Sequence, residues 1–142
     1  KAIRRQRQMC IRDRYKKSGP NVLGVEALQG DDGCTGVKVN TADGYADYLF
    51  SATDMQAHHP SKRVSFCGGL GLIREKEGQI QLMYLGCGRS LKKGNFVLES
   101  DHDVYAAIYM QHGVWYYSAT GPVRVKIGKE TKELNEGYNQ KL

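Results

Sequence analysis

The sequence predicts an all-β protein, an antiparallel β-sandwich of about ten short strands. Three observations support this prediction. Apolar and polar residues alternate with period two in many short segments. Turn residues separate these segments at intervals of about 8–12 residues, which is typical of sandwiches and barrels. No segment carries a 3.6-residue apolar stripe of helical length, so no room remains for the crossover helices of a parallel sheet.

The predicted fold centres on a hairpin. The apolar run 70–73 is followed by a charged, glycine-ended turn and by the segment 79–85. In that second segment, Ile80, Leu82 and Tyr84 alternate with another row of side chains. Because side chains on a strand switch faces at every residue, we expect this row to be buried and the other to face solvent.

Strands with the same character precede and follow the hairpin. The longest irregular segment is 53–62, the glycines around Cys87 predict a turn at 86–88, and the tail 128–142 is either a weak strand or a frayed end. The predicted strands are 22–28, 35–40, 45–51, 63–67, 70–73, 79–85, 95–99, 104–110, 114–118 and 123–127.

Two of these strands show their faces clearly. Between 45 and 51, Ala46, Tyr48 and Phe50 share one face. Between 104 and 110 the alternation is complete, which predicts one buried face and one outer face. The two faces are Val104, Ala106, Ile108 and Met110 on one side, and Tyr105, Ala107 and Tyr109 on the other.

The positive net charge of +6 is confined to the N-terminal segment. Residues 1–17 hold eight Lys/Arg and one Asp, whereas the rest of the chain holds 13 Lys/Arg and 14 Asp/Glu. A nucleic-acid-binding face needs clustered cations on the folded part, so nucleic acid is not an expected partner. No apolar run approaches the ~20 residues that span a bilayer, so no membrane association is expected.

The basic leader itself resembles a translation product of a sequencing adapter over residues 1–14, most closely at Met9–Arg14. We expect residues 1–17 to be an artefactual or disordered leader and residues 18–142 to form the β-sandwich domain. A basic nucleic-acid arm and a mitochondrial-type presequence are the alternatives. An artefactual leader implies that the natural chain is longer, and that the domain is the C-terminal fragment of a larger protein.

Cysteine and histidine give no metal signature. Cys34, Cys67 and Cys87 lack the paired spacing of a zinc ribbon, and we expect neither a metal nor a cofactor. Buried free thiols and a disulfide between Cys67 and Cys87 are alternatives that the sequence leaves open.

Polar candidates for a site are His102 and His112. His102 lies between two aspartates, which have the atom types for acid–base work, but the segment 101–103 reads as a solvated turn before Val104. No nucleophile elbow, P-loop or metalloprotease motif is present, so the catalytic residues are unknown.

The aromatic residues are the most suggestive set. Their functional interpretation is a platform for sugar stacking, because pyranose rings present apolar faces to flat rings. Their structural interpretation is cross-strand packing, worth about 0.2–1 kcal/mol per pair. The candidates are Tyr105, Tyr109, Trp115 and Tyr117. Strand alternation places Tyr105 and Tyr109 on one face, and Trp115 and Tyr117 on another.

Residues 37–127 resemble the C-terminal β-sandwich region of heparinase II/III-like polysaccharide lyases. The resemblance lies in an aspartate–aromatic strand, a glycine-spaced strand that ends in arginine, and a later aromatic sheet. The corresponding segments are Asp47–Phe50, Val64–Arg74, Val104–Ala107, Trp115 and Gly121–Val125. These motifs are glycine and hydrophobic spacings rather than catalytic signatures, so no catalytic residue is carried over.

The resemblance implies a domain that supports a lyase without catalysing the reaction itself. Such lyases cleave uronate-containing glycans by β-elimination, and a large N-terminal helical domain supplies most of the cleft. The implied partners are a polysaccharide and that N-terminal catalytic domain, and the implied location is extracellular or periplasmic. The alternative is a stand-alone module that binds a glycan or a protein and has no enzymatic activity.

Overall fold

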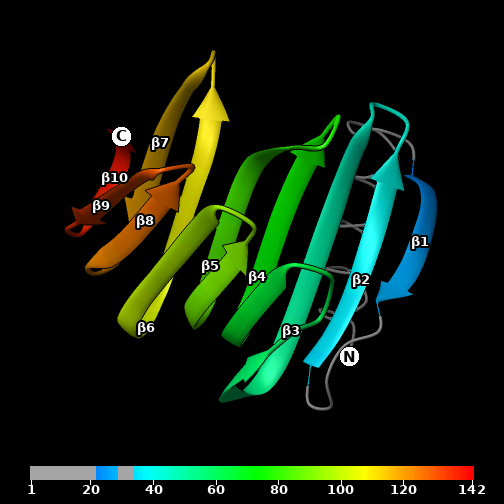
Figure 1. Ribbon diagram of the computed structural model, residues 1–142, viewed down its shortest axis with the longest axis horizontal. Helices are drawn as coiled ribbons and strands as arrows, with labels where there is room; N and C mark the ends of the chain where they lie inside the picture. Colours follow the sequence, from blue (N-terminus) through cyan, green and yellow to red (C-terminus); the bar gives the residue numbers. More distant parts are fainter. Residues whose placement is uncertain (1–21, 29–33) are drawn as a thin grey trace, which may run out of the picture.

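The computed structural model of the protein describes residues 22–28 and 34–142, and this part of the chain contains ten strands and no helix (Figure 1). Since this part of the chain has no helix, it contains no helix that could span a membrane. The predicted all-β fold of about ten strands is confirmed. The strands are β1 (Val22–Leu28), β2 (Cys34–Thr41), β3 (Tyr45–His58), β4 (Val64–Lys76), β5 (Gln79–Lys93), β6 (Phe96–Gln111), β7 (Val114–Ala119), β8 (Val123–Ile127), β9 (Glu130–Leu134) and β10 (Gly137–Lys141).

All neighbouring strands pair antiparallel in one hydrogen-bonded network. The order is β1-β2-β3-β4-β5-β6-β7-β10, and β8 pairs with both β6 and β9. Consecutive strands are neighbours through most of this order, because short turns join them. The tail that the sequence left undecided forms β9 and β10, which lie at two different edges.

Four long strands fold this single sheet into two layers. The first layer contains β1, β2, β7 and β10, with 45–52 of β3, 70–76 of β4, 79–86 of β5 and 104–111 of β6. The second layer contains 57–58 of β3, 64–67 of β4, 90–93 of β5 and 96–99 of β6, together with β8 and β9. The register shifts where β3, β4, β5 and β6 pass from one layer to the other. We call this line of bulges the bend.

Glycines make the bend sterically feasible. Gly69 has a φ of 69°, and a Cβ there would lie 2.1 Å from the carbonyl oxygen of Gly86. A Cβ on Gly88 would lie 2.4 Å from the carbonyl oxygen of Gly68. The backbones of β4 and β5 therefore approach each other so closely that a residue with a Cβ does not fit at these positions.

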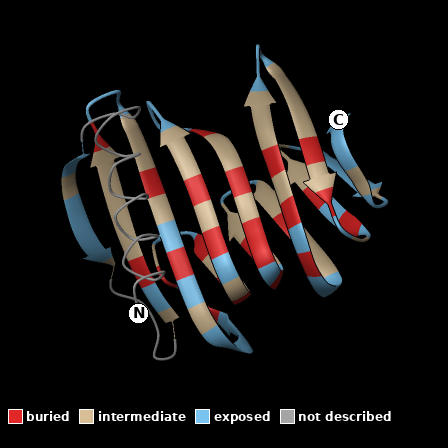
Figure 2. Ribbon diagram, turned by 180° about the vertical axis from the view of Figure 1, so that it is seen from behind, coloured by how far each residue is buried: buried red, intermediate tan, exposed pale blue. Residues whose placement is uncertain are grey.

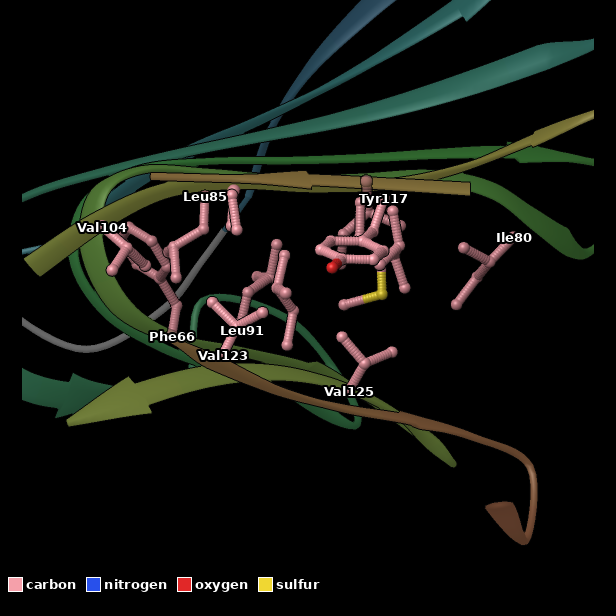
Figure 3. Close-up of a cluster of buried hydrophobic side chains, with 14 of the residues drawn as sticks. Phe66, Ile80, Leu85, Leu91, Val104, Tyr117, Val123 and Val125 are labelled. Carbon is pink, nitrogen blue, oxygen red and sulfur yellow. The ribbon is translucent and has the colours of Figure 1, made fainter. Parts of the chain in front are cut away.

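The core lies between the two layers (Figure 3). Leu85 and Tyr117 point inward from the first layer, and Val123 and Val125 point toward them from β8. Buried positions recur along the central strands, while β1 and β10 are mostly exposed (Figure 2). Apolar side chains on the inner faces thus define the two-layer architecture.

Bulges account for the local predictions that were wrong. In β5 the buried row passes from Ile80 to Met83 and Leu85, not to Leu82 and Tyr84, because the register shifts at the β4 pairing of Ile80. The predicted turn at 86–88 is an irregularity inside β5, and β3 continues through 53–58, which was expected to be irregular.

Other predicted faces are confirmed. Phe50 is buried, and Val104, Ala106 and Ile108 form the inner row of β6. The predicted leader, residues 1–17, lies outside the described residues.

We predict that Gly69→Ala destabilises the fold more than Gly113→Ala does. Both glycines have positive φ, but a Cβ on Gly113 would meet nothing within 4 Å. Gly113→Ala should cost about 1–2 kcal/mol of unfolding free energy from backbone strain alone. Gly69→Ala should add about 1–3 kcal/mol, because the new methyl group meets backbone that cannot move aside.

Urea denaturation of the two variants and the parent protein measures this difference. Equal losses of stability would mean that the close approach at the bend does not constrain the fold.

Candidate functional site

The predicted aromatic candidates divide between the two faces of the first layer. Tyr105 and Tyr109 lie on the outer face, which is turned away from the second layer, whereas Trp115 and Tyr117 lie on the inner face. Strand alternation predicted this division. Consequently the four rings do not form one continuous platform.

Tyr117 packs within the core. It is 8 % exposed, and its hydroxyl donates a hydrogen bond to the carbonyl oxygen of Asn135 at 3.2 Å. The ring lies among other core side chains in Figure 3. Its contacts are those of a structural residue, and it does not present its ring to solvent.

The outer face carries a cluster of tyrosines with polar partners. Tyr109 stacks on Tyr116 across the β6–β7 pair, with ring centroids 5.9 Å apart and an angle of 18° between the rings. The Tyr109 hydroxyl donates a hydrogen bond to the side-chain oxygen of Asn139, and the Asn139 N–H donates to Ser118 Oγ at 2.9 Å. These bonds hold the edge strand β10 against the sheet.

Tyr105 is the most exposed of the four candidates, at 53 %. The nearby Cys87 sulfur, through its charge and a hydrogen bond, raises the pKa of the Tyr105 hydroxyl above its ordinary value of 10.0. A raised pKa leaves less of the hydroxyl ionised near neutral pH, and the ionised form is the one that removes protons, so the shift does not favour a role as base.

Trp115 lines a cleft at the end of the two-layer fold that lies opposite the bend. Its ring and that of Phe96, from the second layer, are 5.9 Å apart at an angle of 48°. The cleft has a volume of about 440 Å³ and is also lined by Ile80 and Met110 of the first layer. We call this feature the end cleft.

The rim of the end cleft is charged. Arg63, Glu75 and Lys93 line it, and Lys93 forms a 2.7 Å ion pair with Glu75. The Lys93 ammonium also lies over the Tyr48 ring, 4.1 Å from its centroid. No sequence signal pointed to a role of Arg63, because Arg63 is only the first residue of the predicted strand 63–67.

The histidine candidates do not converge on one site. His102 is exposed within β6, where pairing with β5 is interrupted, so the segment 101–103 is solvated as expected but is not a turn between strands. His112 is exposed in the β6–β7 turn with a φ of 51°. The described residues include no group of three or more His, Cys, Asp or Glu that could hold a metal ion.

A His–carboxylate pair that the sequence did not single out lies near the end of β3. His58 is buried, and its Nε2 is 2.7 Å from Asp54 Oδ1. The hydrogen bond from His58, with a second from the Gln56 N–H, lowers the pKa of Asp54. This pair fastens the irregular part of β3, and the end cleft is lined by other residues.

Cys67 and Cys87 are free thiols. Cys67 donates to the carbonyl oxygen of Met55 at 3.2 Å and is half-buried, while Cys87 is exposed. The Cys67–Cys87 disulfide is therefore not formed in this structure. The expectation of buried thiols is wrong for Cys87, because the bulge at the bend turns its side chain outward.

A partly buried ion pair crosses the outer face of the first layer. Arg74 Nε and Nη2 donate to the two carboxylate oxygens of Asp47 at 2.8 and 2.9 Å, and the Asp47 side chain is 5 % exposed. This bidentate geometry fixes β3 against β4. The aspartate and arginine that carried part of the family resemblance are thus a structural pair.

An ion-pair network covers the second layer. Arg124 Nη1 donates to Glu99 Oε1 at 2.8 Å, and Lys92 Nζ lies 3.4 Å from Glu99 Oε2. Burial by itself would raise the pKa of Glu99, but the hydrogen bond from Arg124 and the charge of Lys92 outweigh it and lower this pKa below 4.5. The network ties β5, β6 and β8 together.

The fold and its surface define a class of protein: a two-layer antiparallel β-domain with an aromatic end cleft and no convergent acid–base cluster among its described residues. The family model described as the endo-acting ulvan lyase C-terminal domain matches residues 22–110. The chain belongs to this family, which is a polysaccharide lyase C-terminal domain. No curated protein and no solved structure matches the chain.

The family match covers the first five strands and almost all of β6. Arg63, Phe96, Tyr105 and Tyr109 lie within it, whereas Trp115 and Tyr117 follow it. The end cleft is therefore built from both matched and unmatched segments.

We predict that Glu99→Gln removes a pH-dependent part of the stability. The lowered pKa of Glu99 means that the network stabilises the fold fully above the unfolded-state pKa, and that this contribution is lost as the pH falls through the folded-state pKa. At pH 7 the variant should be about 0.5–1 kcal/mol less stable than the parent. The difference should vanish well below pH 4, where the carboxyl group is protonated in both states.

Chemical denaturation at neutral and acidic pH measures this contribution. Glu130→Gln is the control, since Glu130 forms no ion pair among the described residues, and its effect should not change with pH. A Glu99→Gln difference that persists in acid would contradict the prediction.

Proposed function

We propose that this chain is the C-terminal β-domain of an ulvan-degrading polysaccharide lyase, and that it supports the elimination reaction without catalysing it. The family match over residues 22–110 carries this proposal. The sequence motifs that resemble heparinase II/III-like lyases support a finer form of it, in which a helical N-terminal domain of that type holds most of the catalytic cleft.

The chemistry of the reaction explains the supporting role. β-Elimination needs a base that removes the proton α to the uronate carboxylate and an acid that protonates the departing glycosidic oxygen. Both groups must reach one sugar linkage. His102 and His112 lie at separate exposed positions, and His58 is engaged with Asp54, so these three histidines do not supply such a pair.

The outer face of the first layer supports attachment to the rest of the lyase. Leu49 and Leu70 are 37 % and 57 % exposed, and they border a shallow hollow with an almost wholly apolar lining. The hollow also includes Val37, Leu72 and Tyr84. Apolar surface of this kind is typical of contact with another protein surface, and a family described as a C-terminal domain supports the remainder of the same enzyme as its occupant.

A second function is favoured by the end cleft, namely a stand-alone module that binds a glycan. The two proposals differ in what the outer face does. A lyase domain uses it for attachment, whereas a stand-alone module leaves it without a partner. For either role we propose an extracellular or periplasmic location, where a polymeric glycan is accessible.

We expect the chain alone to release no unsaturated uronate products from ulvan, and the lyase polypeptide that carries it as C-terminal domain to release them. Ultraviolet absorbance of the unsaturated products measures both reactions. Degradation of ulvan by the chain alone would overturn the supporting role.

The attachment surface is tested in the same lyase polypeptide with Leu70→Arg. The variant should lower the melting temperature of the joined protein but not that of the chain alone, because Leu70 is exposed in the chain. Thr131→Arg on β9, in the other layer, is the matched control. Equal melting temperatures of the joined parent and the Leu70→Arg variant would exclude this face as the contact.

A further inference from the structure

The end cleft has the size and chemistry of a ligand site. Its volume of about 440 Å³ lies within the range of about 300–1,000 Å³ that is typical of small-molecule sites. It lies where the layers are farthest from the bend, between the β4–β5 turn at Gly78 and the β5–β6 turn at Gly94. In Figure 3, Ile80 marks this end of the core.

One wall of the cleft is aromatic. Trp115 and Phe96 are both half-buried, so their rings pack on the core and still form surface. On its other side, Trp115 lines a smaller hollow of about 260 Å³ with Val125, Ile127 and Leu142. The indole thus separates the two hollows, and the Leu142 N–H donates a hydrogen bond to the Trp115 carbonyl oxygen at 2.9 Å.

The rim of the cleft carries an excess positive charge. Glu75 is neutralised by its 2.7 Å ion pair with Lys93, and Arg63 forms no ion pair with any described carboxylate. Arg63 is exposed, so its charge is available at the mouth of the cleft. An anionic group is the complement of this rim.

The backbone holds Arg63 in place by an unusual conformation. Its φ is 64°, and its carbonyl oxygen accepts a hydrogen bond from the Gly94 N–H at 3.2 Å. A Cβ on Gly94 would lie 2.8 Å from Arg63 Nη2, so glycine allows the guanidinium to lie against the β5–β6 turn. A non-glycine residue in the left-handed region carries strain, which points to a role for this side chain at the mouth.

We propose that the end cleft binds a short acidic segment of a polysaccharide, with Trp115 and Phe96 in contact with a sugar ring and Arg63 bound to its carboxylate or sulfate group. This proposal rests on the proposed function for its choice of a glycan, while its geometry and charge stand independently. The site would hold the polymer next to the catalytic part of the lyase, and raise the local concentration of substrate linkages there.

Intrinsic fluorescence tests the proposal directly, because Trp115 is the sole tryptophan of the chain. Titration of the full 142-residue chain with a uronate-containing tetrasaccharide prepared from ulvan should change the Trp115 emission and saturate. Cellotetraose, a neutral chain of equal length, should bind much more weakly. The acidic ligand should also bind more weakly as salt is added.

Arg63→Asn is the most informative variant, since asparagine tolerates a positive φ and removes the charge without new strain. It should weaken binding of the acidic tetrasaccharide about tenfold or more, because a charge-assisted hydrogen bond is lost. Arg89→Asn is the matched control: Arg89 is also exposed, pairs with Asp103 at 2.9 Å and does not line the cleft. It should bind like the parent.

Trp115→Phe examines the aromatic wall, with calorimetry in place of fluorescence. It should weaken binding about threefold to tenfold while the variant retains the circular dichroism spectrum of the parent. An unchanged emission at saturating tetrasaccharide, or equal affinity in the parent and Arg63→Asn, would overturn the proposal. If the joined lyase is active but the isolated domain does not bind the tetrasaccharide, this binding site is excluded and the proposed function still stands.

Discussion

The close approach of two backbones at the bend is the constraint on which the rest of the structure depends. A Cβ on Gly69 of β4 would lie 2.1 Å from the carbonyl oxygen of Gly86, and a Cβ on Gly88 of β5 would lie 2.4 Å from the carbonyl oxygen of Gly68. Without this contact β4 and β5 could not bend together, and the sheet could not return over itself. The inner faces would then have no opposing layer to exclude water from Phe66, Leu85 and Leu91.

The bend also determines where a ligand site can form. Because the layers are continuous at one end, they can separate only at the other, and the end cleft lies there. Phe96 and Trp115 come from strands in different layers and meet at this opening. The outer face, by contrast, is a continuous surface of the first layer with its tyrosines and leucines. The proposed attachment to a larger enzyme and the proposed contact with a glycan therefore use separate surfaces of one small domain.

Local alternation was sufficient to predict much of this architecture. It gave the all-β class, the inner row of β6 and the division of the aromatic candidates between two faces. The strand bounds differ: the predicted strands 63–67 and 70–73 are both part of β4, and 95–99 and 104–110 are both part of β6. Alternation failed wherever a bulge changed the register, as in β5, where Met83 and Leu85 are buried in place of Leu82 and Tyr84. At a bulge, two residues of one strand lie opposite a single residue of its partner, so the side chains after it change faces. A period-two pattern along one strand does not reveal where this happens.

The sequence by itself determined the fold class, because period-two patterning and frequent turns are local properties of the chain. It also supplied the residue types of the candidate site. Only the tertiary structure decided that Tyr117 is buried, that Trp115 reaches the open end of the fold, and that Arg63 stands beside it. The physical reason is that these relations join residues of different strands and layers, and they depend on how the bend brings distant parts of the chain together.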